Sequence, residues 1–382
     1  MKDYSFSIPQ EVIVGKGTLS KLPDTAGRLG MKHSFIISGP HLKKIGTVDK
    51  CSRLLEKAGI KADSFCETEG NPSVETVTRA VLAFKKSGAD SIIAFGGGSP
   101  MDVAKAVGIV AKYGGSITDY EGGGKVPGDI IPLIAIPTTA GTGSEVTAFS
   151  VITDHSRKYK LTVFSYKLIP RAAILDADLI ASVPAQISSA CGIDAFIHAF
   201  ESYISKAASP FSEAMSEKAM ELIGKYIRRY VSDRSDPEAA EGMLSGSLFA
   251  GIAFSWARLG NIHAMSHPVS AFWNVPHGVA NGILLPIVTE FNEAEDKGKY
   301  FRVYNYISEK KIAEDSFRAP MLTEALKKLN HEIGIPEKLS DAGVTEEYFD
   351  KMADDAMKSG NIAVNPRKTV KEDILTLYRR AL

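Results

Sequence analysis

Cysteine, tryptophan and net charge are all scarce in this chain of 382 residues, which has 3 cysteines, 2 tryptophans and 45 acidic against 45 basic residues. Cys51, Cys66 and Cys191 are scattered and lack CxxC spacing, which argues against a disulfide framework and is typical of a protein in a reducing cytoplasm. The net charge of zero, without a basic block, argues against nucleic acid as a partner.

Long apolar runs and targeting signals are also missing. No stretch reaches the roughly 18 apolar residues of a membrane span, and the first residues, Met1-Lys2-Asp3-Tyr4-Ser5-Phe6, lack the apolar run of a signal peptide. We find no internal repeat and no low-complexity linker. With 44% apolar and 24% charged residues, the composition is that of a globular protein, which we expect to be cytoplasmic and without membrane partners.

The length favours two domains, and the pattern of the chain changes near residue 183. Before it, short apolar runs alternate with helical patterns. Strands are expected at 34–38, 60–66, 90–95 and 133–136, with shorter ones around Val151, Leu161 and Ile174, and helices at 48–58, 74–86 and 100–112. After Pro184 the pattern is helical throughout. We therefore predict an α/β domain with a parallel, Rossmann-like sheet at residues 1–183 and an all-α domain at 184–382.

Two turns rich in glycine or threonine follow predicted strands. Gly96-Gly97-Gly98-Ser99-Pro100 opens a helix, where free backbone N–H groups favour a phosphate. Pro137-Thr138-Thr139-Ala140-Gly141-Thr142-Gly143-Ser144-Glu145 offers hydroxyls and amides to ribose or pyrophosphate oxygens. Parallel strands bring such turns to one edge of a sheet, which predicts a nucleotide site there. A purely structural strand-to-helix turn is the alternative for the glycines.

Histidines cluster in the second half of the chain. Asp194 and His198 stand four residues apart in a helical pattern, so both side chains leave the same face and can share one divalent cation. His263, His267 and His277 follow among apolar residues, where unpaired polar groups are unfavourable. Buried imidazoles near a carboxylate, drawn from separate segments, indicate a metal site.

The chain resembles the iron-containing (group III) alcohol dehydrogenase family, which includes lactaldehyde reductases and propanediol and butanol dehydrogenases. The resemblance runs nearly end to end, through Pro9–Gly17, Asn71-Pro72, Gly96–Lys105, Pro137–Thr147, Gly192–Tyr203, His263–Leu285 and Asn365-Pro366-Arg367. It implies an α/β nucleotide domain with an all-α metal domain, the dehydroquinate synthase-like fold. The implied reaction is hydride transfer between NAD(P)(H) and a short-chain primary alcohol or aldehyde, by a homodimer or larger homo-oligomer.

The resemblance also implies a set of metal ligands, Asp194, His198, His263 and His277. One carboxylate and three imidazoles suit Fe²⁺, with Zn²⁺ as the alternative. A cation held there would polarise the substrate carbonyl. His267 matches a family position near the metal that is not a ligand, and we expect it to act catalytically, in proton relay or substrate contact. A hydrogen-bonded core histidine is the alternative.

Several residues match cofactor-binding positions of the family. Gly97, Gly98, Ser99 and Asp102 resemble the pyrophosphate loop and the helix behind it, Asn71 the adenosine side, and Leu179 a wall of the site. Further cofactor contacts are implied for Thr138, Thr139, Thr142, Thr147 and Lys160. For Lys160 a solvated surface lysine is the alternative.

Gly39 stands where NAD-preferring relatives usually carry an aspartate that holds the ribose 2′-hydroxyl. Without that carboxylate a 2′-phosphate meets no repulsion, and Lys43 and Lys44 follow shortly after. We therefore predict that NADP(H) is accepted. A turn glycine without a role in cofactor choice is the alternative.

The substrate is the least constrained feature. Phe254 matches a substrate-pocket position, and Arg258 would lie one turn beyond it on the same helical face. Relatives for small neutral alcohols usually carry small or apolar residues at Trp256, Arg258 and Asn261. An arginine there can clamp a carboxylate or sulfonate, which favours a polar or anionic aldehyde, such as succinic semialdehyde or a sulfonated acetaldehyde. An ion pair of Arg258 with an acidic residue across an interface is the alternative.

Three other functions compete with this one. Glycerol dehydrogenases and dehydroquinate synthases share the superfold and use Zn²⁺, but they lack the full Gly260–Gly278 pattern. A non-catalytic metal- or nucleotide-binding module would bind cofactor without oxidising it. A structural role belongs to related domains fused behind an aldehyde dehydrogenase, a region that this sequence does not contain. We therefore predict a metal-dependent alcohol dehydrogenase.

Overall fold

The computed structural model describes residues 4, 6, 8 and 10–382 of the chain. Pro9, which opens one of the family-like segments, lies outside the described residues, as do residues 1–3, 5 and 7. The described chain forms two compact units. The sheet unit comprises the described part of Ser7–Thr139 together with Gly143–Ala181, and the helical unit comprises Ala140–Thr142, Ser182–Leu382 and the described part of Met1–Phe6. The main change of unit thus falls at Ala181–Ser182, beside the boundary expected after residue 183.

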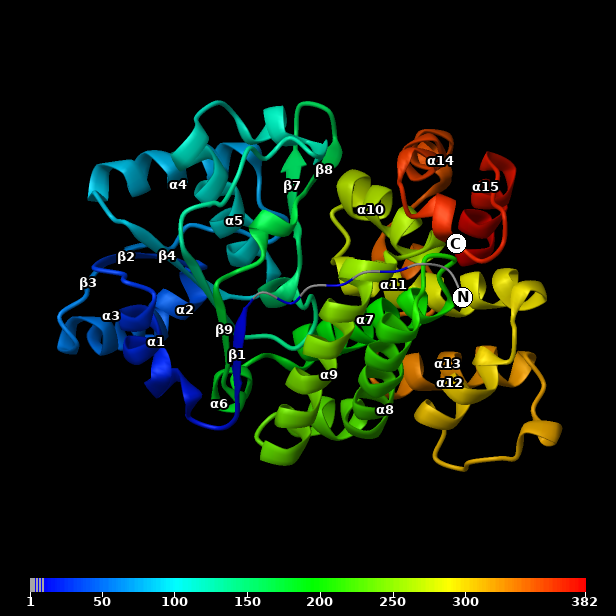
Figure 1. The fold of residues 1–382 in the computed structure, drawn as a ribbon. Helices are drawn as coiled ribbons and strands as arrows, with labels where there is room; N and C mark the ends of the chain where they lie inside the picture. The colour runs from blue at the N-terminus through cyan, green and yellow to red at the C-terminus, as the bar shows by residue number, and fades with distance from the viewer. Residues whose placement is uncertain (1–3, 5, 7, 9) are drawn as a thin grey trace. The chain divides into compact units, whose positions relative to one another are not determined.

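The sheet unit is built on six parallel strands in the order β1-β9-β6-β4-β2-β3 (Figure 1). They are β1 Glu11–Val14, β2 His33–Ile37, β3 Lys61–Phe65, β4 Ser91–Gly96, β6 Leu133–Pro137 and β9 Ala172–Leu175. The predicted parallel α/β sheet is confirmed. The edge strand β1, which is four residues long, was not predicted. β7 Phe149–Asp154, β8 Tyr159–Phe164 and the short β5 Gly122–Gly123 form a separate sheet.

Helices cover both faces of the six-stranded sheet, as side-chain alternation along the strands requires. On β2, Ile36 packs in one core with residues of α1 Leu22–Arg28 and α3 Thr47–Lys57. Its neighbours Phe35 and Ile37 pack in the other core with α4 Val74–Ser87 and α5 Gly98–Tyr113. The same alternation holds along β4 and β6, so both faces of the central strands are apolar. The short helices α2 Pro40–Lys44 and α6 Ala177–Ile180 complete the unit.

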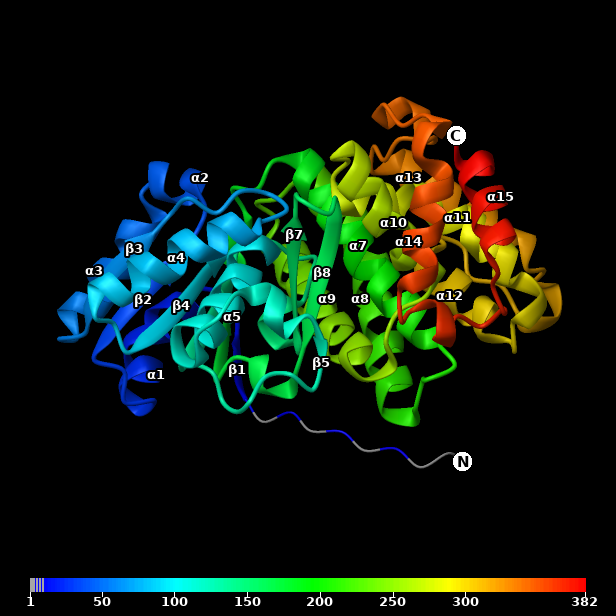
Figure 2. The same ribbon diagram turned by 90° about the horizontal axis from the view of Figure 1, so that it is seen from above.

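The helical unit is organised around α7 Ala185–Ile204, which packs against α8, α9 and α11 (Figure 2). Its residues 192–203 are all buried, so α7 is a central helix rather than an amphipathic surface one. The remaining helices are α8 Pro210–Ser232, α9 Pro237–Ala257, α10 Asn261–Trp273, α11 His277–Asn292, α12 Lys299–Ile307, α13 Pro320–Glu332, α14 Phe349–Lys358 and α15 Lys371–Ala381. None of the helices in the described part of the chain has the length and apolarity to cross a membrane.

Candidate functional site

Three polar side chains lie along one face of the buried helix α7. Asp194, His198 and Glu201 follow one another at spacings of four and three residues, which place them on successive turns. They are 3%, 5% and 2% exposed, respectively. Polar groups so deeply buried require partners, and these come from other helices of the same unit.

The three predicted histidine ligands converge on Asp194. His263 comes from the first turn of α10, and His277 is the first residue of α11. The distances from Asp194 Oδ1 to the Nε2 atoms are 3.9 Å for His198, 3.6 Å for His263 and 3.8 Å for His277. One ligand atom each of Asp194, His263 and His277 lies within 4.8 Å of the others, so these three could hold a metal ion. The ring of His198 stacks on that of His263, with centroids 4.7 Å apart.

The charges of this cluster favour a cation. Although burial acts to raise the pKa of Asp194, the neighbouring imidazoles hold it well below its usual range, so the carboxylate is ionised. Burial lowers the pKa of His198 to about 4, which keeps its ring neutral and able to ligate. Burial also acts to lower the pKa of His263, but its hydrogen bonds to Asp194 and Glu201 outweigh this and raise it to about 9.

Asn281, one turn after His277 on α11, was not predicted. Its Nδ2 lies 2.6 Å from Asp194 Oδ1, 3.2 Å from His263 Nε2 and 3.1 Å from His277 Nε2. No described group bonds to the buried Asn281 Oδ1. Asp194 Oδ1 and the Nε2 atoms of His263 and His277 thus surround the positively polarised amide group of Asn281, as they would surround a cation. The donor set therefore fits a divalent metal, and an oxygen acceptor adjoins it.

Glu201 was also missed as a functional residue, although it lies in the quoted Gly192–Tyr203 segment. Its Oε2 accepts a hydrogen bond from His263 Nδ1 at 2.6 Å. A proton held on Nδ1 leaves Nε2 with its lone pair toward Asp194, which is the tautomer that a ligand needs. The spacing of Asp194, His198 and Glu201 on one helical face was the signal that could have identified it.

His267 and Phe254, predicted as a catalytic and a substrate residue, lie beside the imidazoles. The His267 ring centroid is 5.2 Å from that of His277 and 6.3 Å from that of His263. The Phe254 ring stacks on His198 with centroids 4.5 Å apart. His267 and Phe254 therefore both adjoin the cluster of Asp194 and its three histidines.

Arg258 differs from its expected geometry. Helix α9 ends at Ala257, and Arg258 is exposed with a φ of 59°. The assumption that it continues the helical face of Phe254 is therefore wrong, because a positive φ turns the chain out of the helix. The proposed role of Arg258 toward substrate must rest on its charge and exposure instead.

The two predicted turns of the sheet unit adjoin at the carboxyl ends of neighbouring strands. β4 and β6 pair with Gly96 opposite Pro137, and Thr138 N donates to Gly96 O at 2.9 Å. α5 then begins at Gly98, with Gly97 as its N-cap and Ser99 in its first turn. A Cβ atom added to Gly97 would lie 3.2 Å from Thr139 Oγ1, so the two turns touch. A sheet edge with a helix N-terminus is where α/β proteins bind nucleotide phosphates.

Lys105 ties the polar residues behind these turns together. It is fully buried, and its Nζ donates to Ser144 Oγ, Thr147 O, Thr147 Oγ1 and Phe149 O at 2.8–3.0 Å. Asp102 Oδ1 accepts from Ser144 Oγ at 3.2 Å. Burial raises the pKa of Asp102 to about 6, against the opposing charge of Lys105. Asp102 and Thr147 are thus held in a common network, which Lys105 organises although no role had been predicted for it.

The remaining predicted cofactor residues are dispersed. Lys160 Nζ donates to Asn71 Oδ1 at 2.8 Å, which brings two of them together. Leu179 is buried in a core of the sheet unit. Thr142 belongs to the Ala140–Thr142 segment that groups with the helical unit. A Cβ atom on Gly141 in that segment would lie 2.7 Å from Cys191 Cβ of α7, so the packing there is close.

Gly39 follows β2, which pairs with β4, so it lies at the same edge of the sheet as the two turns. It is the N-cap of α2 and has a φ of −94°, a conformation open to any residue. Lys43, which follows in α2, forms an ion pair with Asp49.

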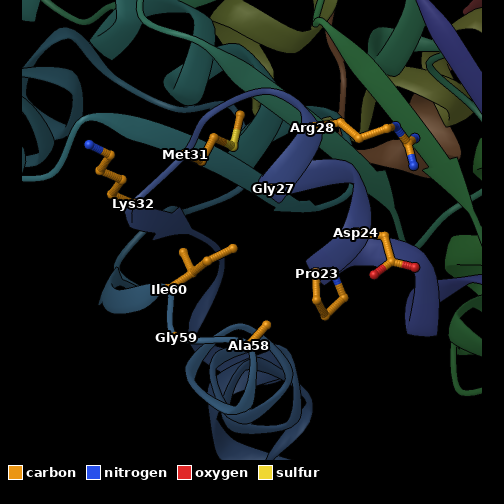
Figure 3. A pocket seen from close by; sticks show the side chains of 9 residues that line it. All are labelled: Pro23, Asp24, Gly27, Arg28, Met31, Lys32, Ala58, Gly59 and Ile60. Atoms are coloured by element: carbon orange, nitrogen blue, oxygen red, sulfur yellow. The ribbon is translucent and has the colours of Figure 1, made fainter.

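A wide surface hollow of about 710 Å³ lies elsewhere in the sheet unit (Figure 3). Its lining includes Met31, Lys32 and Ile60, which directly precede β2 and β3. The hollow thus adjoins the amino ends of the strands. Since nucleotides bind at the carboxyl ends of such strands, we do not assign the cofactor to it.

Two family models match the chain in sequence. The model described as iron-containing alcohol dehydrogenase covers residues 9–177, and that described as the C-terminal part of the Fe-containing alcohol dehydrogenase family covers residues 188–382. Lactaldehyde reductase of Escherichia coli K12 is 37% identical over 372 residues, 96% of each chain. The crystal structure of a 1,3-propanediol oxidoreductase superposes over 100% of both chains with a TM-score of 0.95 at 35% identity. A sulfoacetaldehyde reductase from Bifidobacterium kashiwanohense, solved with NAD⁺, gives 0.90 at 29% identity over 100% of this chain and 99% of its own.

A parallel nucleotide-type sheet and a helical unit with a carboxylate–imidazole cluster define a metal-assisted, nicotinamide-dependent oxidoreductase. The chain belongs to the iron-containing alcohol dehydrogenase family. It is a nicotinamide-dependent alcohol dehydrogenase and aldehyde reductase acting on small alcohols and aldehydes. The predicted family, fold class and reaction class are thereby confirmed.

Proposed function

We propose that Asp194, His198, His263 and His277 hold the iron of this alcohol dehydrogenase, with Zn²⁺ as an alternative occupant. The observation that supports this is the convergence of three imidazole Nε2 atoms on Asp194 Oδ1 within 3.9 Å. When bound, the cation supplies Lewis-acid chemistry to the substrate carbonyl. Measuring metal content and activity after removal of the Asp194 carboxylate tests the assignment.

The other residues of the cluster would hold the reacting groups and move a proton. Glu201 keeps the proton of His263 on Nδ1, and Phe254 packs on the His198 ring. A nicotinamide bound at the nucleotide site would supply the hydride for aldehyde reduction, and one proton must reach the carbonyl oxygen. We assign that proton to an imidazole nitrogen of His267, which takes it back in alcohol oxidation.

The nucleotide is assigned to the carboxyl edge of β2, β4 and β6. Gly97, Gly98 and Ser99 would bind the pyrophosphate at the start of α5, with Thr138 and Thr139 beside them. Asp102 and Thr147 would support this surface through Lys105, while Asn71 and Lys160 act as a pair. Thr142 and Leu179 complete the proposed set.

Replacing Gly39 with aspartate should shift preference from NADPH toward NADH. The wild type should accept NADPH, since Gly39 presents no carboxylate to a 2′-phosphate. The substitution is sterically open, because a Cβ atom there would lie 3.4 Å from Thr68 O. A carboxylate facing a phosphate costs several kcal/mol, so the ratio of kcat/KM for NADH over NADPH should rise by at least about tenfold. Steady-state kinetics with both cofactors measures it. A wild type more than about a hundredfold better with NADH would contradict the proposed NADPH use.

We propose further that the substrate is a short polar aldehyde with an anionic tail. Arg258 is an exposed arginine four residues beyond Phe254 in the sequence, and guanidinium groups bind carboxylates and sulfonates in a bidentate manner. The similarity to a sulfoacetaldehyde reductase is consistent with an anionic substrate. A neutral aldehyde such as propanal is the competing substrate.

The Arg258→Ala variant distinguishes these substrates. We expect kcat/KM for an anionic aldehyde to fall about tenfold or more, as loss of a charged hydrogen bond of 1.5–3 kcal/mol implies, while propanal is reduced as before. The measurement is a four-way comparison of wild type and variant with sulfoacetaldehyde and propanal. Equal changes for both aldehydes would show that Arg258 does not recognise charge.

Assembly and location complete the proposal. We propose a homodimer or larger homo-oligomer, on the basis of the family resemblance, and light scattering on the purified protein measures its mass. A cytoplasmic location is supported by the scattered cysteines, and cell fractionation tests it.

A further inference from the structure

Helix α10, which carries His263, begins without a capping side chain of its own. Its N-cap is Gly260, and the first backbone N–H groups of a helix need acceptors. They find them on distant side chains: Ile262 N donates to Glu201 Oε1 at 2.7 Å, and Asn261 N donates to Asn365 Oδ1 at 3.2 Å. Glu201 and Asn365 are 2% and 1% exposed. Two buried residues from elsewhere therefore set where this helix starts.

The same Glu201 also orients the ring of His263. Its Oε2 accepts from His263 Nδ1 at 2.6 Å, while Oε1 accepts from the backbone one residue earlier. A single carboxylate thus controls both the start of α10 and the tautomer of the first histidine on it. One of these bonds fixes the backbone just before His263 and the other fixes its ring. Together they set the direction of His263 Nε2.

Asn365 connects this arrangement to α11. Its Nδ2 donates to Asn292 Oδ1 and to Arg367 O, both at 2.8 Å, and Asn292 ends the helix that His277 begins. The space at Gly260, between Glu201 Oε1 and Asn365 Oδ1, is tight. A Cβ atom on Gly260 would lie 2.8 Å from Glu201 Oε1 and 3.0 Å from Asn365 Oδ1, so only glycine fits between them.

We propose that Glu201 and Asn365 are positioning residues that clamp the N-terminus of α10 and thereby direct His263 Nε2 at the metal. This deepens the proposed metal centre and rests on it. The proposal also gives a role to the closing Asn365-Pro366-Arg367 segment, which the reaction itself does not use. Neither residue contacts substrate or cofactor in this assignment.

The isosteric Glu201→Gln substitution is the sharpest probe. The site presents donors on two sides, the Ile262 N–H and the His263 Nδ1–H, and the carboxylate accepts from both. A glutamine has one acceptor oxygen and one donor amide, so either orientation leaves a donor facing a donor. His263 can relieve the conflict by moving its proton to Nε2, which then cannot bind a metal.

The experiment measures Zn²⁺ affinity of chelator-stripped protein by competition with a chromophoric chelator. We expect Glu201→Gln to bind about 10- to 100-fold more weakly than wild type, the usual effect of losing a group that orients a ligand. Glu201→Asp, which keeps two acceptor oxygens, should bind more tightly than Glu201→Gln. Asn365→Ala should weaken binding in the same direction. Glu290→Gln is the matched control, because Glu290 lies on α11 but pairs with Arg380 at the surface. This variant should bind Zn²⁺ as tightly as the wild type does.

NADPH affinity, followed by fluorescence, should stay the same in every variant, because the proposed nucleotide residues, apart from Thr142, belong to the sheet unit. If Asp194→Ala loses Zn²⁺ but Glu201→Gln binds it like wild type, the positioning role is wrong while the metal centre stands. If Asp194→Ala binds like wild type, the metal centre itself is wrong and the clamp falls with it. Should Glu201→Gln not fold, equal affinities of Asn365→Ala and wild type overturn the proposal, and weaker binding by Asn365→Ala supports it.

Discussion

Replacing Asp194 with alanine is expected to remove the metal and to lower kcat/KM for aldehyde reduction by at least about 10³-fold. Asp194 is the only carboxylate among the four proposed ligands, and its Oδ1 is the atom on which the three imidazoles converge. Its pKa lies well below the usual range, so its negative charge persists at every working pH. Losing a Lewis acid worth several kcal/mol accounts for that fall in rate. Elemental analysis and steady-state kinetics on the same sample measure both quantities.

Two companion variants locate the cause. Asp194→Asn keeps the shape of the side chain and one ligand oxygen but loses the charge. Excess metal should therefore restore the kcat/KM of Asp194→Asn further than that of Asp194→Ala. Asp233→Asn changes an exposed carboxylate of the helical unit and should leave metal content and kcat/KM unchanged. Wild-type turnover by a metal-free Asp194→Ala protein would show that the reaction needs no cation at this site.

Substitution of Gly278 by alanine should disrupt the metal centre through the backbone. A Cβ atom at Gly278 would lie 2.0 Å from Ala190 O of α7, a separation that no relaxation of side chains can relieve. The start of α11 must therefore move away from α7, and His277, the adjoining residue, moves with it. We expect unfolding free energy to fall by about 3 kcal/mol and metal affinity to fall at least about tenfold. Chemical denaturation of the metal-free protein and chelator competition measure the two effects.

Gly282→Ala is the matched control on the same helix. The Cβ atom there would meet the Ile335 side chain at 2.9 Å rather than a backbone carbonyl. A side chain can rotate, so this variant should be less destabilised and should retain His277 in place. Equal metal affinities for Gly278→Ala and wild type would mean that the close contact of α7 and α11 does not set the position of His277.

Local patterns in the sequence determined the elements on which the proposed site is built. Strand-then-glycine segments predicted β4 and the start of α5, because a buried strand, a tight turn and a helix each depend on neighbouring residues. The spacing of Asp194 and His198 likewise predicted a shared direction, since one helix relates them. The family resemblance, read from ordered motifs, supplied the ligand set and the reaction class.

Only the tertiary structure decided which distant groups meet these residues. Glu201 and His263 are 62 positions apart, and Asn281 reaches Asp194 from 87 positions away. Such pairs depend on how helices pack, as where Gly278 lets α11 approach Ala190, and no local pattern encodes that approach. Arg258 shows the reverse case: a helical spacing predicted its face, but the chain leaves the helix there with a positive φ. Spacing along one element is a property of the sequence, whereas the direction of a side chain toward another element is set by the packed core.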